Sequence, residues 1–293
     1  MTRCDLSLGF IGLGALGLPM ASNLVKAGFP LRVHTRSRRA ETTPDLAGAL
    51  PCATPAEATA GVDVLVLCVS NDAAVEAVLF GPNGAADALK PGARVLDCST
   101  ISPAQAIRCG ERLKSRGVSY LDAPVTGGTE GARAGTLTVL VGGEAAALAS
   151  VRPVLEVIGG TIHHFGAIGR GQQVKAVNQV LVAGSYAAVA EAMALGQRLQ
   201  LPMPQVVDAL KGGAAGSWAL SHRAEGMLDG RYPLGFKLAL HHKDLSIALA
   251  AADSVQLELP ITALVQQQER DLMRQGFGDE DVSALHRLHG TKS

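Results

Sequence analysis

Leu6-Ser-Leu-Gly-Phe-Ile-Gly-Leu-Gly-Ala-Leu-Gly17 is the stretch that decides the fold of the first half of the chain. A short apolar run ends directly in a Gly-x-Gly-x-x-Gly motif, and a helical pattern continues from the motif to Ala27. A strand, a glycine turn and a helix in this order are typical of a dinucleotide-binding fold. In that fold Gly12 permits the turn, Gly14 lets a pyrophosphate approach the backbone, and Gly17 lets the helix pack on the strand. The free amides of the helix N-terminus then face the phosphates.

The residues after the second expected strand, 30–34, indicate which nicotinamide cofactor binds. A site for NAD usually has an acidic residue there, which holds the ribose hydroxyls. Here the chain reads Thr35-Arg36-Ser37-Arg38-Arg39, and no carboxylate follows before Glu41. Because a guanidinium can form paired hydrogen bonds with phosphate oxygens, the sequence favours NADP(H), with NAD(H) also possible. A solvated basic loop is the alternative interpretation.

Strand and helix patterns alternate through the rest of the first half. The expected strands are 62–69, 94–98, 118–123, 136–141 and about 161–165, and the expected helices are 73–79, 102–116 and 144–157. Polar residues follow two of these strands, at Ser70-Asn71 and at Ser99-Thr100, where the ligand crevice of a doubly wound sheet lies. We therefore expect an α/β fold, with an N-terminal Rossmann-type doubly wound sheet over residues 1–166.

The second half has no such alternation. From about Ile168 to Leu199 no proline interrupts a helical pattern. Shorter helical runs follow near 204–211, 217–228, 236–252 and 260–275, with a final piece over 279–288. We expect a long interdomain helix and an all-α C-terminal domain over residues 167–293.

The long helix has a lysine on an apolar face. Lys175 shares that face with Asn178 and Gln179, which follow it by three and four residues among valine, alanine and leucine. One interpretation is that the lysine extends its amine to water along the apolar surface. The other is a partly desolvated amine with a lowered pKa, held by the two amides and able to pass a proton near neutral pH.

The segment Asp122-Ala-Pro-Val-Thr-Gly-Gly128 follows an expected strand. Thr126 offers a hydroxyl, and Gly127 and Gly128 expose backbone amides with no side chain in the way. Such a turn can bind a carboxylate. An ordinary glycine loop is the alternative interpretation.

Composition argues against several classes of partner. The formal net charge of +0 implies no general attraction to nucleic acid or to an anionic membrane, and it favours a small-molecule partner. The five cysteines form no CxxC pair, so we expect a reducing cytoplasm and neither a disulfide framework nor a zinc site. The adjacent His241 and His242 would point about 100° apart on a helix, so no metal is expected there. Residues 174–195 approach membrane length but include charged and amide side chains, so we expect no membrane span. The N-terminus has no continuous apolar region followed by a cleavage site, so we expect no signal peptide.

Four segments together resemble the β-hydroxyacid dehydrogenases, the family of 3-hydroxyisobutyrate dehydrogenase, tartronate semialdehyde reductase and the glyoxylate/succinic semialdehyde reductases. They are residues 12–20, 122–143, 169–179 and 243–245, in the order of the family and over nearly the whole chain. The resemblance implies a Rossmann-type domain joined by a long helix to a helical domain. It also implies an active site in the cleft and commonly a homodimer or homotetramer.

The resemblance implies roles for individual residues as well. Lys175 would be the catalytic lysine, with Asn178 or Gln179 orienting its amine. Substrate contacts are expected from the glycine turn: Thr126, Gly127 and Gly128. Independently of the resemblance, the helical domain offers candidates for further lining of the substrate pocket, and a structural role is the alternative interpretation for each: Trp218, His222, Arg223 and Phe236. Cofactor contacts are expected from the glycine motif, the ends of the strands and one residue of the helical domain: Gly12, Leu13, Gly14, Ala15, Leu16, Gly17, Met20, Thr35, Arg36, Ser37, Val69, Ser70, Asn71, Thr100 and Lys243.

Two features of the sequence bear on the substrate. The family usually has serine where this chain has Thr126, which keeps the hydroxyl and adds a methyl group. The amide pair Asn178-Gln179 is more like that of tartronate semialdehyde reductase.

The expected activity is reversible hydride transfer between NADP(H) and a small β-hydroxy acid or semialdehyde, with Lys175 as general acid and base. Substrates of the glyoxylate, succinic, tartronate and methylmalonate semialdehyde type all fit this expectation. The alternatives are an imine reductase or a neutral-alcohol dehydrogenase of the same fold, or a non-catalytic NADP-binding regulator.

Overall fold

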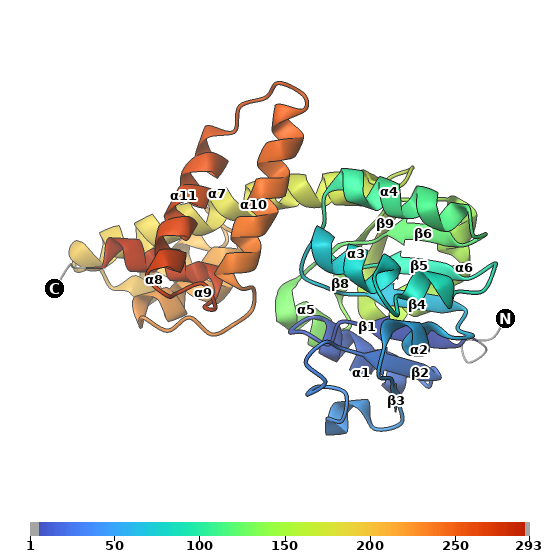
Figure 1. The fold of residues 1–293 in the computed structure, drawn as a ribbon. Helices are drawn as coiled ribbons and strands as arrows, with labels where there is room; N and C mark the ends of the chain where they lie inside the picture. The colour runs from blue at the N-terminus through green and yellow to red at the C-terminus, as the bar shows by residue number, and fades with distance from the viewer. Residues whose placement is uncertain (1–5, 291–293) are drawn as a thin grey trace. The chain divides into compact units, whose positions relative to one another are not determined.

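The computed structural model describes residues 6–290, and the chain divides into two compact units after Lys175 (Figure 1). The division falls inside the longest helix. Strands and helices alternate in the first unit, and the second unit is helical.

The first unit is built on a sheet of six parallel strands in the order β3-β2-β1-β4-β5-β6. The strands are β1 (Leu8–Ile11), β2 (Leu31–His34), β3 (Leu50–Pro51), β4 (Val64–Leu67), β5 (Arg94–Asp97) and β6 (Ser119–Asp122). The strand order reverses between β1 and β4, so the sheet is doubly wound and its ligand crevice lies at the carboxyl ends of these strands. The expected Rossmann-type fold is confirmed.

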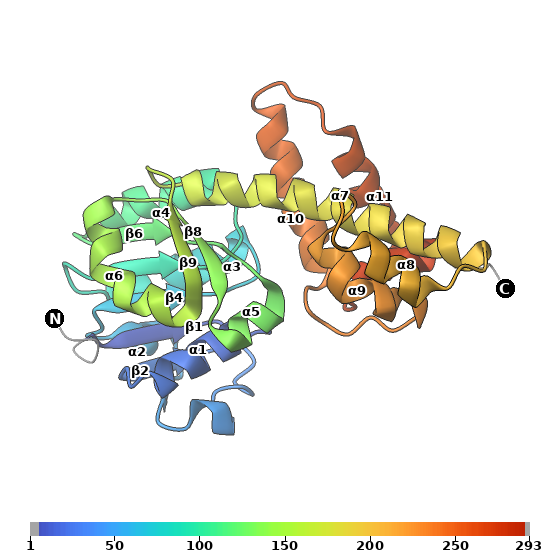
Figure 2. The ribbon, with the colours of Figure 1, turned by 180° about the vertical axis from the view of Figure 1, so that it is seen from behind.

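Helices cover both faces of this sheet (Figures 1 and 2). They are α1 (Gly17–Lys26), α2 (Pro55–Thr59), α3 (Asp72–Phe80), α4 (Pro103–Lys114) and α6 (Ala145–Ile158), with the 3-10 turns η2 (Pro44–Leu46) and η3 (Ala85–Asp87). Along β4, Val64 and Val66 belong to the core beneath α1 and α6, whereas Leu65 and Leu67 belong to the core beneath α3 and α4. Burial on both faces explains why β4 reads as a continuous apolar run.

A second sheet of three strands lies in the same unit. In it β7 (Val125–Thr126) pairs antiparallel with β8 (Leu137–Val141), which pairs parallel with β9 (Gly159–His164). The sequence predicts β8 and β9 but not their separation from the main sheet. It does not predict helix α5 (Gly128–Ala134), because Gly128, Thr129 and Gly131 give that segment a low helix propensity. Strand β3 and helix α2 were missed because such short segments show no periodic pattern.

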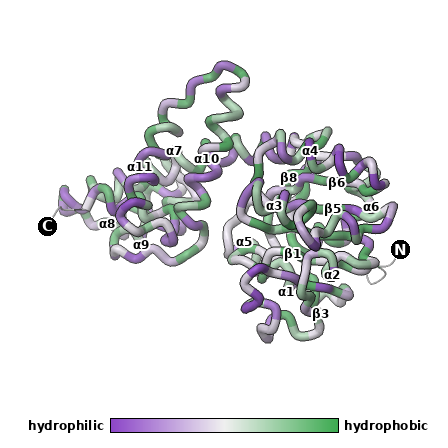
Figure 3. Tube along the Cα trace, viewed as in Figure 1, coloured by the Kyte–Doolittle hydropathy of each residue, from purple (hydrophilic) through white to green (hydrophobic). Residues whose placement is uncertain are grey.

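Helix α7 (Arg170–Arg198) confirms the long helix, and both hydrophobic and hydrophilic residues lie along it (Figure 3). Within residues 6–290 it is the one helix that is long and apolar enough to cross a membrane, by length and composition alone. Its buried residues Ala183, Ala190 and Met193 pack in the core of the second unit. The core helix of a globular domain has the same composition.

The second unit confirms the expected all-α C-terminal region. After α7 come α8 (Met203–Leu210), α9 (Trp218–Leu228), α10 (Leu238–Asp253), α11 (Pro260–Arg274) and the 3-10 helix η4 (Val282–His289). Helices α10 and α11 form a hairpin and lie side by side (Figures 1 and 2). Leu220, Leu245, Leu272 and Leu285 join α9, α10, α11 and η4 in one apolar core.

Candidate functional site

The glycine motif forms the turn between β1 and α1. Gly12 has φ +103°, a conformation that glycine adopts without strain. A Cβ atom at Gly17 would lie 1.8 Å from the Gly12 carbonyl oxygen, so only glycine allows the helix to begin this close to the turn. Helix α1 has no acidic residue in its first turn, which leaves its N-terminal amides suited to an anion.

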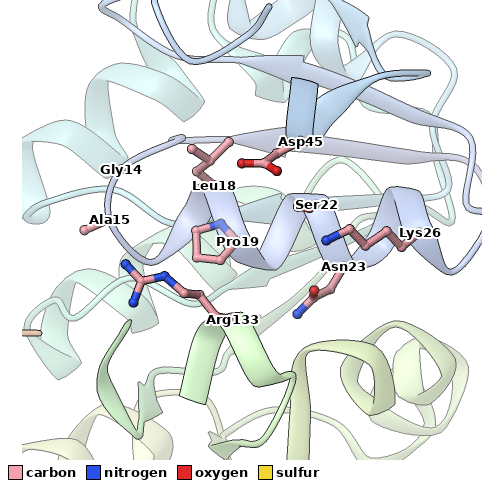
Figure 4. Close-up of a pocket in the computed structure, with 9 residues that line it drawn as sticks. All are labelled: Gly14, Ala15, Leu18, Pro19, Ser22, Asn23, Lys26, Asp45 and Arg133. Carbon is pink, nitrogen blue, oxygen red and sulfur yellow. The ribbon is translucent and has the colours of Figure 1, made fainter. Parts of the chain in front are cut away.

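A pocket of about 480 Å³ borders this turn and continues along α1 (Figure 4). Gly14 and Ala15 line one part of it, and Lys26, Asp45 and Arg133 line the rest together with the outer face of α1. Other residues of the motif lie elsewhere. Leu13 is buried and its amide donates to Thr35 Oγ1 at 3.4 Å, Leu16 packs on the core, and Met20 is fully buried within the core.

The end of β2 differs from the sequence interpretation in one respect. Glu41 returns to the strand end, where its buried carboxylate accepts a hydrogen bond from the Thr35 amide at 2.8 Å and pairs with Arg38 at 2.9 Å. This carboxylate is therefore bound to the protein itself. Arg36 and Ser37 are exposed at the same strand end.

The ends of β4 and β5 are joined by hydrogen bonds between their loops. The Val69 amide donates to Ser99 Oγ at 2.9 Å. Asn71 caps α3 by accepting from the Ala74 amide at 2.8 Å. Thr100 lies between Ser99 and Ile101. Ser70 is exposed beside this crevice.

Two buried carboxylates lie at the carboxyl ends of β5 and β6, where Asp97 and Asp122 are register partners. Asp97 accepts from the Ser99 amide at 2.9 Å and from the Tyr120 hydroxyl at 2.7 Å. Burial raises the pKa of Asp97 to about 6, against the effect of these hydrogen bonds. Burial also raises the pKa of Asp122, although backbone amides, chiefly that of Gly169, oppose the shift.

Lys175 lies beside the segment that the sequence assigned to the substrate. Its side chain is 7 % exposed, and its amine donates to the Val125 carbonyl oxygen at 2.9 Å. Val125 precedes Thr126 in β7, and Gly127 and Gly128 follow at the start of α5. The structure thus brings together the lysine and the proposed carboxylate-binding turn. The interpretation that Lys175 extends its amine to water is wrong, because the side chain is buried.

In the second unit a chain of hydrogen bonds connects three of the sequence candidates. Asn178 Nδ2 donates to Gln179 Oε1 at 2.7 Å, and Gln179 Nε2 donates to Asp244 Oδ2 at 2.6 Å. The other Asp244 oxygen pairs with the Lys243 amine at 2.8 Å. Asp244 has no role predicted from the sequence, and it holds this network together.

Trp218 and Phe236 make ring contacts elsewhere in the second unit. Trp218 is 43 % exposed, stacks on His222 with ring centroids 4.5 Å apart, and has the Arg223 guanidinium 4.6 Å from its ring. Phe236 makes an edge contact with His241 at 5.6 Å.

The residues considered for metals and disulfides have other roles. His241 Nδ1 lies 2.5 Å from Glu269 Oε1, and both side chains are fully buried. Within residues 6–290 no three histidine, cysteine, aspartate or glutamate side chains are grouped to hold a metal. The four cysteines of this range are free thiols, and Cys4 lies outside the described residues.

Two residues that hold the start of α7, Asp122 and Gln172, are not among the site residues predicted from the sequence. Gln172 side-chain atoms contact the Ser99 carbonyl oxygen at 2.8 Å and the Ile101 amide at 3.2 Å. The available signal was the position of Gln172, three residues before Lys175 and on the same helix face.

Comparisons with known proteins agree with a nicotinamide-dependent site. Residues 7–166 match the family model described as the NAD binding domain of 6-phosphogluconate dehydrogenase. Residues 169–289 match the model described as NAD-binding of NADP-dependent 3-hydroxyisobutyrate dehydrogenase. The chain belongs to the β-hydroxyacid dehydrogenase family.

Individual relatives span the whole chain. The 2-hydroxy-3-oxopropionate reductase of Escherichia coli is 40% identical over 280 residues, which are 96% of this chain and 96% of that protein. The NAD-dependent L-serine dehydrogenase of Pseudomonas aeruginosa is 37% identical over 288 residues, 96% of this chain and 97% of that protein. The crystal structure of 3-hydroxyisobutyrate dehydrogenase from Salmonella typhimurium has a TM-score of 0.88 and 32% identity, and covers 97% of this chain and 100% of that one. This β-hydroxyacid dehydrogenase is an NAD(P)-dependent oxidoreductase.

Proposed function

We propose that the protein transfers hydride reversibly between NADP(H) and a small β-hydroxy acid or semialdehyde, with Lys175 as the general acid and base. The observation that supports this most is the buried Lys175 amine, 2.9 Å from the Val125 carbonyl oxygen and next to the Thr126–Gly128 turn. An amine removed from water at this position can donate a proton to a substrate oxygen and stabilise its developing negative charge.

The cofactor supplies the hydride, and the chain supplies the binding surface, the orientation and the proton. The glycine turn at Gly12–Gly17 would bind the pyrophosphate through its amides. Thr100, Val69, Ser70 and Asn71, at the ends of β4 and β5, would line the nicotinamide end of the crevice. Lys243, which pairs with Asp244, is also proposed as a cofactor contact.

The substrate carboxylate would bind to the Thr126 hydroxyl and to the amides of Gly127 and Gly128. Holding the carboxylate there would place the adjacent carbonyl carbon near Lys175, so that the proton reaches the oxygen as the hydride reaches the carbon. Asn178 and Gln179 follow Lys175 on α7 and would orient its amine or hold the substrate. Gln179 is fixed for such a role by its hydrogen bond to Asp244. Trp218 and Phe236 are proposed as further lining of the substrate pocket.

A preference for NADP(H) rests on Arg36. Glu41, the one carboxylate at the end of β2, is buried and bound to the Thr35 amide and Arg38, which leaves it unsuited to ribose hydroxyls. Arg36 is exposed at the same strand end and would bind the 2′-phosphate.

Among substrates we propose tartronate semialdehyde first. The amide pair Asn178-Gln179 supports it, and so does the name of the Escherichia coli relative, since 2-hydroxy-3-oxopropionate is the same compound. Glyoxylate, succinic semialdehyde and methylmalonate semialdehyde follow, because each has a carbonyl near one carboxylate.

We also propose a homodimer or homotetramer in the cytoplasm. Four large apolar side chains along the long helix are more than half exposed in the single chain: Val177, Leu181, Leu195 and Leu199. The first three lie in α7, and Leu199 directly follows it. Exposed apolar residues along one helix support burial against another copy.

The test is the initial rate of NADPH oxidation, beside NADH, with each of the four carbonyl acids. A clear preference for NADPH with one of them is expected. If all four are inactive while a cyclic imine or a neutral carbonyl is reduced, the proposed substrate class is wrong.

A further inference from the structure

Asp122 is a fully buried carboxylate at the carboxyl end of β6. Its Oδ1 accepts a hydrogen bond from the Gly169 amide at 2.7 Å, and its Oδ2 accepts from the Gln172 amide at 2.9 Å. These amides lie at the beginning of α7, whose first turn has no helical partners for its N–H groups. One carboxylate therefore fixes the start of the helix that contains Lys175.

The chain leaves room for this carboxylate with two glycines. A Cβ atom at Gly142 would lie 2.5 Å from Asp122 Oδ1, and one at Gly171 would lie 2.9 Å from Oδ2. Any side chain at either position would push the carboxylate away from the helix amides.

The side chain of Gln172 adds two further hydrogen bonds between the start of α7 and the main sheet. Its Nε2 donates to the Ser99 carbonyl oxygen at 2.8 Å, and its Oε1 accepts from the Ile101 amide at 3.2 Å. The first turn of α7 is thus attached to the ends of both β5 and β6.

The Lys175 amine contacts the segment that follows Asp122 in the chain. Lys175 follows Gln172 by three residues, about one turn of α7. Val125, whose carbonyl oxygen accepts a hydrogen bond from the Lys175 amine, follows Asp122 by three residues, in the segment that connects β6 to β7. A shift of the helix start relative to Asp122 would therefore move the amine relative to Thr126.

We propose that Asp122 is a positioning residue that sets the place of the Lys175 amine relative to the substrate-binding turn. The inference rests on the proposed function, because it requires Lys175 to transfer the proton. Asp122 does not touch the substrate in this account. It acts through the beginning of α7.

The experiment is a double-mutant cycle on the single-turnover rate of NADPH oxidation, with the preferred semialdehyde at saturation. The variants are Asp122→Asn, Lys175→Ala and the double variant. Asparagine keeps one acceptor oxygen but places an NH₂ group against a helix N–H. The contact between residue 122 and the start of α7 is therefore weakened, and no cavity is created. When Lys175 is present, Asp122→Asn should lower the single-turnover rate at least about 10-fold, as expected for a small misplacement of a reacting group. In the Lys175→Ala background the same substitution should lower the rate less than about 2-fold.

The matched control is Asp97→Asn on the neighbouring strand. Asp97 is also fully buried and is the register partner of Asp122, but its hydrogen bonds go to Ser99 and Tyr120. Asp97→Asn should change the rate by the same factor in the parent chain and in the Lys175→Ala background. Asp122→Ser, which retains a helix-capping oxygen, is the second variant if Asp122→Asn does not fold, and it should show the same dependence on the lysine.

The outcomes separate the two claims. An equal loss of rate in both lysine backgrounds, for either Asp122 variant, would overturn the positioning role and leave Lys175 in place. An unchanged rate in Lys175→Ala would overturn the proposed function and the positioning role with it. Addition of ethylamine should restore the rate of Lys175→Ala to the same extent whether residue 122 is aspartate or asparagine, since a free amine needs no positioning by α7.

Discussion

The Lys175 amine donates a hydrogen bond to the Val125 carbonyl oxygen, and Val125 is followed directly by Thr126. The relationship joins a helix residue to a strand residue 50 positions earlier in the chain. It places the amine that we propose as the proton donor on the residue that precedes Thr126, whose hydroxyl we propose for the substrate carboxylate together with the Gly127 and Gly128 amides. A carboxylate bound there would have its carbonyl neighbour within reach of the amine.

Thr126 gives a test of the carboxylate site. Thr126→Ala removes a hydrogen bond to a charged group and should raise KM for the semialdehyde about 10- to 100-fold, the range for losing such a bond. Thr126→Ser keeps the hydroxyl and should stay within about 3-fold of the parent chain. Steady-state kinetics at fixed, saturating NADPH measures both. Equal effects of the two substitutions would assign the loss to the methyl group and not to the hydroxyl.

Arg36 gives a test of cofactor preference. Arg36→Ala should weaken NADPH binding about 10- to 100-fold, because a charge-assisted contact with the 2′-phosphate is lost, and should leave NADH binding unchanged. The exposed Arg39 of the same loop provides the matched control, Arg39→Ala. Fluorescence titration with each nucleotide measures the dissociation constants. A larger loss from Arg39→Ala would move the phosphate contact to that residue.

Asp97 gives a test of the buried carboxyl pair. Its pKa is raised by burial from 3.8 to about 6, so the folded protein binds this proton more tightly than the unfolded chain. The stabilisation is therefore fully present below the unfolded pKa and is lost as pH rises through the folded pKa.

Asp97→Asn should remove this dependence. From pH 4.5 to pH 7.5 the variant should gain about 2 kcal/mol in unfolding free energy relative to the parent chain. Urea unfolding at both pH values measures the difference, with Asp253→Asn on the exposed surface of α10 as the control. A difference between variant and parent that stays constant with pH would contradict the raised pKa.

The sequence predicted the doubly wound sheet because strands such as β1 and β4 are apolar runs buried on both faces and are followed by glycine or polar residues. Val64–Leu67 illustrates this, with two side chains in each core. The short, exposed strand β3 lacks this pattern. Helix α5 could not be predicted, because its glycine-rich sequence forms a helix only where neighbouring elements pack on it. The separate sheet of β7, β8 and β9 depends on long-range pairing that the local pattern does not contain.

The residues that we propose to react were better predicted from the sequence than the residues that hold them in place. Lys175 stood out because a charge on an apolar face requires a partner. Asp122 and Glu41 did not, because an aspartate at a strand end and a glutamate in a basic loop look like surface residues until the fold buries them. The link from Gln179 through Asp244 to Lys243 joins residues more than 60 positions apart, which spacing alone does not show.

The most direct test of the account is the single-turnover rate of hydride transfer from NADPH in Lys175→Ala. The rate should fall at least about 10²-fold, as expected for the loss of a general acid, while the dissociation constant for NADPH stays within about 2-fold. Lys114→Ala on the exposed face of α4 is the control for removing a lysine, and its rate should equal that of the parent chain. A rate in Lys175→Ala equal to that of the control would contradict the assignment of Lys175 as the proton donor.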